Sequence, residues 1–467
     1  MYLVRFQHPR PLIHHQRLRC QGMWAEELQC ACPNLVTFDP MKAKSNGSFA
    51  KHCIGFLMVA MLTLLPSHSS GCSIRQLNPK APTSENALKV VTASANEFGL
   101  KLYKGIAREN KGQGQFFSPF SIYAALGMVI EGASGQTQVM ARKALRLPGE
   151  DTIHAGMLAL NKALSESNSE CILAVANAVW PQNSMNVKPL FLETIRSIYL
   201  GQSTPLDLRG DPEGSRTTIN EWVEEQTRDR IVDLLPSGSI NSLSSMILTN
   251  AIYFKGDWEM EFEKKNTKVE PFFTDEGSNP DSPLMYRPNA GSLLKYSEYE
   301  GVQVVELPYE GNELSMVVML PRRGTIGGLE SKMNANKWET IRGGLHHQLV
   351  NVWLPSFKMN RDVQVQQQLI ALGLGGLFTP GEYSNMFESP SEFAVDGVFH
   401  KAFVAVNEEG TEAAAATAFG MVEITSVHKS PPPVIYNFRA DHPFLFFIQH
   451  RKTGAILFMG KVMNPAE

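Results

Sequence analysis

Cysteine is nearly absent from most of this 467-residue chain. Five of the six cysteines lie within the first 72 residues, so residues 73–467 contain only Cys171. A framework of disulfides therefore cannot hold the larger part of the chain together. Cys171 lies in an apolar run, where a free thiol packs as a small hydrophobic side chain, and we expect it to be buried and inert.

An excess of charge of one sign is lacking too. The chain has 43 Lys and Arg against 46 Asp and Glu, which gives a formal net charge of −3. Binding to nucleic acid depends on a basic surface that neutralises phosphates. The composition therefore argues against a nucleic-acid partner.

A hydrophobic run long enough to span a membrane is missing as well. The apolar run at 53–65 has 13 residues, whereas a spanning helix needs about 20. Lysines precede this run and small polar residues follow it, as in a secretory signal peptide. We expect residues 1–40 to be a gene-model extension, residues 41–71 to be a signal peptide, and the mature protein to be secreted without a membrane anchor. An uncleaved signal anchor is the alternative.

Motifs for catalysis and cofactor binding are not found. The sequence has no G-x-S-x-G elbow, no H-E-x-x-H motif and no P-loop. Cys30 and Cys32 lack zinc-site spacing, and the adjacent His346 and His347 do not face the same way on a strand or helix. We therefore expect no enzymatic activity, no cofactor and no metal site.

Helical periodicity opens the remaining chain. After Thr83 and Ser84, apolar residues recur at spacings of three and four, which predicts a helix. Ser118 and Pro119 predict the start of a second, buried helix, because proline is tolerated in a first helical turn. Helical patterns recur at 139–165 and 218–235.

Strand patterns dominate the later chain. They occur at 301–309, 314–320, 350–357 and 399–406, and the last 25 residues read as a buried hairpin. Helices that come first and strands that come later, with little alternation, predict an α+β protein with a mainly antiparallel sheet. No linker divides residues 84–467, so we expect them to form a single domain.

An alanine-rich segment after the strand pattern at 399–406 carries the functional signal. It runs from Glu408 to Ser426, before a cluster of prolines. Alanine favours helix, but the glycines, threonines and later β-branched residues do not extend one. Every second residue from Thr411 to Thr417 is small and uncharged, so this set could enter a sheet without burying a charge. A short amphipathic helix is the alternative interpretation.

This segment and several others resemble the serpin family. The stretch E-E-G-T-E-A-A-A-A-T at 408–417 resembles the hinge of inhibitory serpins. Further similar motifs appear in the family's order: F-S-P-F-S-I at 117–122, I-N-E-W-V at 219–223, L-T-N-A-I-Y-F-K-G-D-W at 248–258, D-H-P-F-L-F at 441–446 and G-A-I-L-F-M-G at 454–460. The resemblance implies a serpin-like α+β fold with about three β-sheets, roughly eight to nine helices and an exposed reactive-centre loop.

The resemblance also implies a function. Inhibitory serpins are suicide inhibitors of serine proteases: the protease cleaves the exposed loop and becomes acylated, and the loop then inserts as a strand into the large sheet. The expected partner is the target protease, held covalently by a monomer. A non-inhibitory member, such as a carrier or chaperone, is the alternative. A glycosaminoglycan partner is open in this family, although the basic residues here are scattered, as at 264–265.

Residue roles follow from the resemblance. The implied hinge consists of Glu408, Glu409, Gly410, Thr411, Glu412, Ala413, Ala414, Ala415, Ala416 and Thr417. In this hinge we expect Gly410 to supply backbone freedom at the bend. A polar cluster under the sheet centre is implied at Ser118, Ser121, Asn250 and His400, and Trp258 matches the tryptophan where insertion begins.

The family's loop length implies the bond that the protease cuts. Counting fourteen residues on from Gly410 reaches Ile424 and Thr425. An aliphatic residue there suits an elastase-like or chymotrypsin-like pocket, whereas a trypsin-like pocket needs a cation. The stretch that follows is longer than usual in the family, so cleavage after Met421 or Lys429 stays open.

Overall fold

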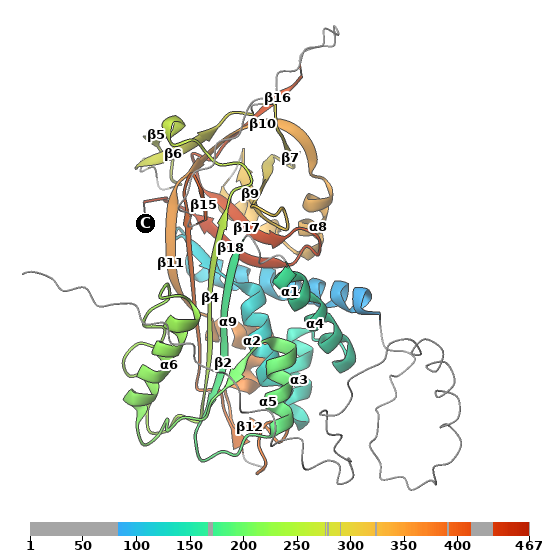
Figure 1. Ribbon diagram of the computed structural model, residues 1–467, viewed down its shortest axis with the longest axis vertical. Coiled ribbons are helices and arrows are strands. Elements are labelled where there is room, and N and C mark those ends of the chain that lie inside the picture. The colour runs from blue at the N-terminus through green and yellow to red at the C-terminus, as the bar shows by residue number, and fades with distance from the viewer. Residues whose placement is uncertain are drawn as a thin grey trace, which may run out of the picture. The chain divides into compact units, whose positions relative to one another are not determined.

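The computed structural model describes residues 83–466 apart from 167–170, 276, 278–279, 290, 323–324, 390–391 and 412–432. These residues belong to the unit Leu77–Glu467. Within the described ranges the chain forms nine α-helices and three β-sheets (Figure 1). The α+β class and the numbers of helices and sheets agree with the prediction.

Capping residues explain where the first helices begin. Thr83 accepts a hydrogen bond from the backbone N–H of Asn86, and α1 follows it at Ser84–Glu109. Ser118 caps α2, Pro119–Gly132, in the same way. The other helices are α3 Gly135–Leu145, α4 Glu150–Glu166, α5 Pro189–Tyr199, α6 Pro212–Gln226, α7 Ile326–Lys332, α8 Ala335–Gly343 and α9 Gln366–Leu369.

Helix α6 ends earlier than the helical pattern at 218–235 predicts. Helix α6 ends at Gln226, nine residues before the end of the predicted range. Arg228 and Asp229 take φ values of 55° and 60°, in the left-handed region, where a right-handed helix cannot continue. Residues 227–229 instead form a turn and residues 230–235 are irregular, although Ile231 and Leu235 are buried. The spacing of these apolar residues therefore indicates that their side chains are buried, not that the segment is helical.

A ten-stranded sheet contains most of the later strands. Its order is β1 Gln115–Phe117, β18 Ile456–Val462, β17 Phe444–His450, β9 Leu314–Pro321, β8 Val302–Pro308, β7 Leu293–Tyr299, β10 His346–Pro355, β6 Asp281–Arg287 and β5 Lys268–Pro271, with β16 Ile435–Arg439 beside β10. Every pairing is antiparallel except that of β10 with β16. The predicted C-terminal hairpin is β17 and β18, joined by a turn in which Gly454 has φ 76°.

A six-stranded sheet receives the functional segment. Its order is β11 Phe357–Gln364, β14 Gly397–Val406, β15 Gly410–Thr411, β4 Met246–Asp257, β2 Ile172–Pro181 and β3 Gln202–Ser203. The third sheet pairs β12 Gly381–Glu382 with β13 Glu392–Phe393. In the six-stranded sheet, β4 and β14 are parallel neighbours over seven residue pairs, Gly397–Phe403 against Ile247–Tyr253.

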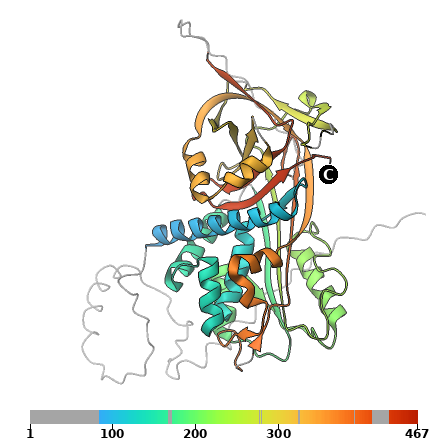
Figure 2. The ribbon, with the colours of Figure 1, turned by 180° about the vertical axis from the view of Figure 1, so that it is seen from behind.

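Helices cover both faces of the six-stranded sheet. Helix α2 contacts β2 and β4, and α6 contacts β2 (Figure 1). The two faces belong to different apolar clusters: Leu248 and Ile252 pack in the main core, whereas Ile247 and Ala251 pack with residues of α6. Figure 2 shows α1 passing between the ten-stranded sheet and α2, and it contacts both. Among the described helices, none is long and apolar enough to cross a bilayer.

Candidate functional site

The described part of the hinge reverses the chain after β14. The side chain of Asn407 accepts hydrogen bonds from the backbone N–H groups of Glu409 and Gly410, at 3.1 and 3.0 Å. The N–H of Asn407 donates to the carbonyl of Gly410 at 2.9 Å. This Asn-centred turn sends β15 back antiparallel to β14, with Val406 opposite Thr411.

Strand β15 lies between β14 and β4. Gly410 pairs with Asp257 and Thr411 pairs with Gly256, both antiparallel. Below this point β14 and β4 pair directly with each other. The hinge therefore occupies the head of the junction between these two parallel strands, where a further strand could enter.

Gly410 is required here by a close approach. A Cβ at this position would lie 2.6 Å from the Cα of Asp257, nearer than real Cβ atoms come to other backbone. Gly410 is not among the glycines with positive φ. The expected reason, backbone freedom at the bend, is therefore not the one that the structure provides, because Asn407 makes the turn and Gly410 lets β15 pack against β4.

Thr411 is anchored inside the fold. Its side chain is fully buried, and its hydroxyl lies 2.8 Å from the hydroxyl of Tyr309. The ring of Tyr309 stacks on Trp258 at 4.6 Å between centroids, with 9° between the planes. Burial raises the pKa of Tyr309 well above its usual value, so the phenol stays neutral and can hydrogen-bond the threonine.

Trp258 holds the hinge backbone through two hydrogen bonds. Its indole N–H donates to the carbonyl of Asn407 at 3.0 Å. Its backbone N–H donates to the carbonyl of Glu409 at 2.9 Å. Because Trp258 follows β4 directly, any movement of the hinge must break contacts at the end of that strand.

The two glutamates that precede Gly410 are held by residues 262–267. The carboxylate of Glu408 accepts from the hydroxyl of Thr267 at 2.7 Å, and its carbonyl accepts from the N–H of Phe262 at 2.8 Å. The ammonium of Lys264 lies 2.6 Å from the carboxylate of Glu409, which raises the pKa of the lysine. From the sequence, Lys264 is one of the scattered basic residues, whereas the structure pairs it with Glu409 of the hinge.

The predicted polar cluster is assembled under the sheet. Ser118 donates from its hydroxyl to the carbonyl of Leu457 at 2.6 Å and from its backbone N–H to Nε2 of His400 at 3.2 Å. His400 Nδ1 is bonded to the amide oxygen of Asn250, and Asn250 donates to Ser121. Each of the four side chains is at most 2% exposed. The structure therefore brings all four predicted residues together.

The bonding pattern defines the state of His400. Nε2 accepts a hydrogen bond, so the proton of the neutral ring lies on Nδ1 and is donated to Asn250. Burial lowers the pKa of His400 to about 3, which keeps the ring neutral at ordinary pH. His400 in β14 and Asn250 in β4 are also register partners. Their bond consequently spans the junction that an inserting strand would open.

Two residues of this site were missed by sequence reasoning. Asn177 in β2 accepts hydrogen bonds from Asn250 and from Ser121, the latter at 3.3 Å. A lone amide in the middle of the apolar run of β2 is a signal that could have indicated it, since buried polar groups need partners. Tyr309 has no comparable signal, because it lies after β8, far along the chain from Thr411.

One group of possible metal ligands occurs in the described part of the chain. Ligand atoms of Glu131, Glu150 and His154 lie within 4.8 Å of one another. His154 already forms an ion pair with Glu131 at 3.2 Å, and the hydroxyl of Tyr199 donates to Glu131 at 2.9 Å. The three residues belong to α2 and α4 rather than to the strands around the hinge.

Other predicted residues lie outside the described ranges. They are the rest of the hinge, Glu412, Ala413, Ala414, Ala415, Ala416 and Thr417, the preferred bond at Ile424 and Thr425, and the alternatives at Met421 and Lys429. The expected gene-model extension and signal peptide, within residues 1–71, also lie outside them.

Comparisons with known proteins agree with this geometry. The family described as "Serpin (serine protease inhibitor)" matches residues 93–465. An uncharacterised serpin-like protein of Methanosarcina acetivorans is 36% identical over 80% of this chain and 88% of its own length. The leukocyte elastase inhibitor of Homo sapiens is 35% identical over 80% and 99% of the two chains. The crystal structure of native protease nexin-1 with heparin superposes with a TM-score of 0.72 at 27% identity, covering 81% of this chain and all of the other.

Proposed function

The chain belongs to the serpin family, and on this premise we propose that it is a single-use inhibitor of serine proteases of the elastase or chymotrypsin type. The observation that carries the proposal is β15, because the hinge already begins a new antiparallel strand between β14 and β4. The relative named leukocyte elastase inhibitor supports a target of the elastase type. The protein is then a substrate that becomes a trap.

The register of β15 supports cleavage at Ile424. If β15 continued along β4 in its present register, Met421 would lie opposite Met246, the first residue of β4. Ile424 would follow three residues later, just beyond the end of the strand. A loop cut after Ile424 is thus long enough to fill the length of β4, and it would carry an attached protease to the far end of the sheet. A loop cut after Lys429 would extend eight residues beyond the end of β4, whereas a loop cut after Met421 would end level with the first residue of β4.

The burial of Thr411 supports the expected alternation of side chains. Directly opposed residues of neighbouring strands share a face. In the continued register Ala413 would oppose Phe254, whose side chain is buried in the main core. Glu412 would oppose Lys255, which is half-exposed and of opposite charge. The small side chain of Ala413 would therefore enter the core, and the carboxylate of Glu412 would remain outside it.

The protease would catalyse cleavage of the loop, and strand insertion by this chain would supply the free energy that traps the protease. The protease serine attacks the carbonyl carbon of Ile424, the bond to the nitrogen of Thr425 breaks, and the protease supplies the proton that the leaving amine takes. The loop, now an ester of the protease, can insert once β14 and β4 separate. Their seven residue pairs and the bond between His400 and Asn250 would be exchanged for pairings with the new strand on both sides.

Incubation with neutrophil elastase tests the proposal. We expect a complex that survives denaturing electrophoresis, together with a released C-terminal peptide that begins at Thr425 by mass spectrometry. A peptide that begins at Val422 or Ser430 would move the bond but keep the mechanism. Quantitative cleavage without any complex, for elastase, chymotrypsin, trypsin and subtilisin alike, would contradict it and favour a non-inhibitory carrier or chaperone.

We also propose that the inhibitor is secreted and acts outside the cell. The support is the sequence alone, since the apolar run at 53–65 has the length and flanks of a signal peptide. N-terminal sequencing of the protein from culture medium tests this. A mature chain that starts near residue 71 is expected, and one that retains residues 1–40 would refute it.

A further inference from the structure

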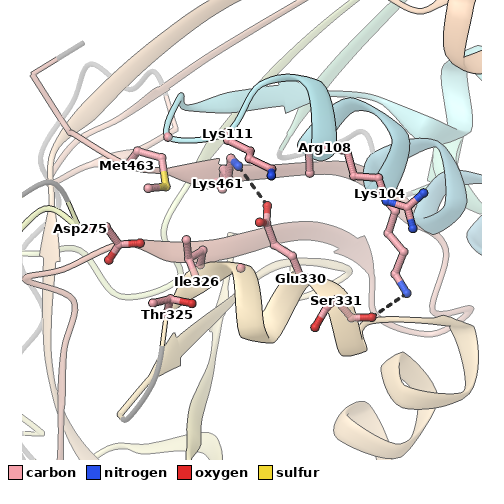
Figure 3. Close-up of a pocket in the computed structure, with 13 residues that line it drawn as sticks. Lys104, Arg108, Lys111, Asp275, Thr325, Ile326, Glu330, Ser331, Lys461 and Met463 are labelled. Atoms are coloured by element: carbon pink, nitrogen blue, oxygen red, sulfur yellow. Dashed lines mark hydrogen bonds and ion pairs between the residues drawn. The ribbon is translucent and has the colours of Figure 1, made fainter.

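A cavity lies apart from the hinge and from the sheet that receives it. It is formed by the end of α1, by α7 and by β18, and has a volume of about 430 Å³ (Figure 3). Small-molecule sites commonly have volumes of roughly 300–1,000 Å³. The cavity is therefore large enough for a small organic ligand.

The cavity is lined by more positive than negative charge. Four cations, Lys104, Arg108, Lys111 and Lys461, face two carboxylates, Asp275 and Glu330, which leaves a formal charge of +2. Figure 3 shows Glu330 reaching from α7 toward Lys461, with Lys111 beside them. An excess of positive charge favours binding of an anion, because the anion would neutralise cations that the protein's own carboxylates leave unpaired.

One ion pair in the cavity is built into the fold. The side chain of Lys461 is only 2% exposed, and its ammonium lies 3.1 Å from the carboxylate of Glu330. The same carboxylate accepts from the buried hydroxyl of Tyr103 at 2.5 Å. Glu330 is therefore already neutralised and fixed in position, so it does not compensate the cations on α1.

The cations at the end of α1 have no carboxylate partner among the described residues. Lys104 donates to the carbonyl of Ser331 at 3.0 Å, a neutral group. Burial and the nearby charge of Arg108 lower the pKa of Lys104. Arg108 and Lys111 are exposed at the mouth of the cavity. Like charges gathered here repel one another until an anion binds.

An apolar wall accompanies the cations. Ala107, Ile326 and Met463 line the cavity, and each is at most 8% exposed. From the volume, the unmatched cations and this wall, we infer that the cavity binds a small amphipathic anion, a sulfate or carboxylate group on an apolar body. The oxoanion would lie against Arg108 and Lys111, and the apolar body against Met463.

Calorimetric titration of the full chain with hexyl sulfate tests the inference, with inorganic sulfate as the reference. We expect hexyl sulfate to bind at least about tenfold more tightly, because burying its methylenes adds to the charge interaction. Loss of both exposed cations, in Arg108→Ala/Lys111→Ala, should weaken hexyl sulfate about tenfold or more. The NMR signal of the Met463 methyl group, assigned with Met463→Leu, should shift on titration.

A charge-matched variant separates this site from general attraction. Lys143→Ala/Lys452→Ala removes two exposed lysines elsewhere and should bind hexyl sulfate as the unaltered chain does. Equal binding of hexyl and inorganic sulfate, equal loss in the two double variants, or an unmoved Met463 signal would overturn the inference. Tighter binding of a heparin hexasaccharide than of hexyl sulfate would also overturn it, because a polysaccharide has no alkyl chain for the apolar wall.

Discussion

Thr411 would determine which side of an inserted loop faces the core. Its hydroxyl is bonded to Tyr309 inside the fold, so alternate residues after it would point the same way. A charge on this side would be buried without a partner, whereas a charge on the other side would reach solvent. Under the proposed mechanism, inhibition would therefore depend on the order of Glu412 and Ala413 and not only on their composition.

Exchanging these two residues tests that order. In Glu412→Ala/Ala413→Glu the composition and net charge are unchanged, but the carboxylate would oppose the buried Phe254. Burying an unpaired carboxylate costs several kcal/mol or more. We expect the variant to be cleaved as a substrate with at least about tenfold less covalent complex per cleavage, measured by denaturing electrophoresis against elastase. Glu412→Ala alone is the control and should still trap the protease, so equal trapping by both would contradict the alternation.

His400 should make the free energy of unfolding depend on pH. Its pKa is about 3 in the folded chain and about 6.5 when unfolded. Below about pH 6.5 the unfolded state binds a proton that the folded state does not, so folding stability falls as the pH drops from 6.5 toward 3. The expected loss from this residue is roughly 1 kcal/mol per pH unit between pH 6 and pH 4.

Urea unfolding from pH 7 to pH 4 measures this loss. His400→Gln cannot titrate, so its free energy of unfolding should fall less steeply over that range than that of the unaltered chain. The exposed His346→Gln lies outside the cluster and should keep the original slope. Parallel slopes for all three proteins would show that His400 is not held neutral in the folded state.

At the scale of elements, the hinge is held by a short segment of another part of the chain. Lys264 and Thr267 bind the carboxylates of Glu409 and Glu408. Trp258 donates hydrogen bonds to the backbone carbonyls of Asn407 and Glu409. These contacts keep β15 at the head of the junction. Releasing them would free the hinge without altering any residue of the loop.

Lys264→Glu should loosen the hinge and β15. The new carboxylate would face that of Glu409, so the ion pair becomes a repulsion. We expect the amides of Trp258 and Gly410 to exchange hydrogen about twofold to fivefold faster, because surface ion pairs contribute modestly. Hydrogen exchange with mass spectrometry measures it. The neighbouring Lys265 pairs with Glu263 instead, and Lys265→Glu should leave both amides unchanged; faster exchange in that variant as well would indicate a general charge effect.

Local patterns predicted the elements better than their ends and contacts. The caps at Thr83 and Ser118 and the apolar strands were readable because each depends on neighbours in sequence. The end of α6 was not, since left-handed residues at 228–229 interrupt a pattern that still reports burial. In the site, family motifs identified His400 and Trp258. The partners Tyr309 and Lys264 lie on other elements, and only the folded chain brings them to the hinge.

At the scale of the whole molecule, the native fold leaves a strand position unfilled. Parallel strands β4 and β14 pair directly where an antiparallel strand from the loop could pair with both. Filling that position would add a hydrogen-bonded strand and bury its alanines. The uncut chain cannot do this fully, because the loop is tied at both ends, to β14 and to β16. If the proposed mechanism holds, a single cut would release one end of the loop and let this strand form.

Cleavage should for this reason stabilise the protein. About ten inserted residues, each adding roughly 1 kcal/mol of net hydrogen bonding, give about 10 kcal/mol. At one to two degrees per kcal/mol for a domain of this size, Tm should rise by roughly 10 °C or more. Differential scanning calorimetry before and after limited proteolysis near Ile424 measures the change. Glu412→Ala/Ala413→Glu, cut at the same bond, should gain much less, because its displaced carboxylate opposes insertion. An unaltered chain that melts at the same temperature before and after cleavage would mean that no strand enters the sheet, and the protein would then share the serpin fold without the inhibitory mechanism.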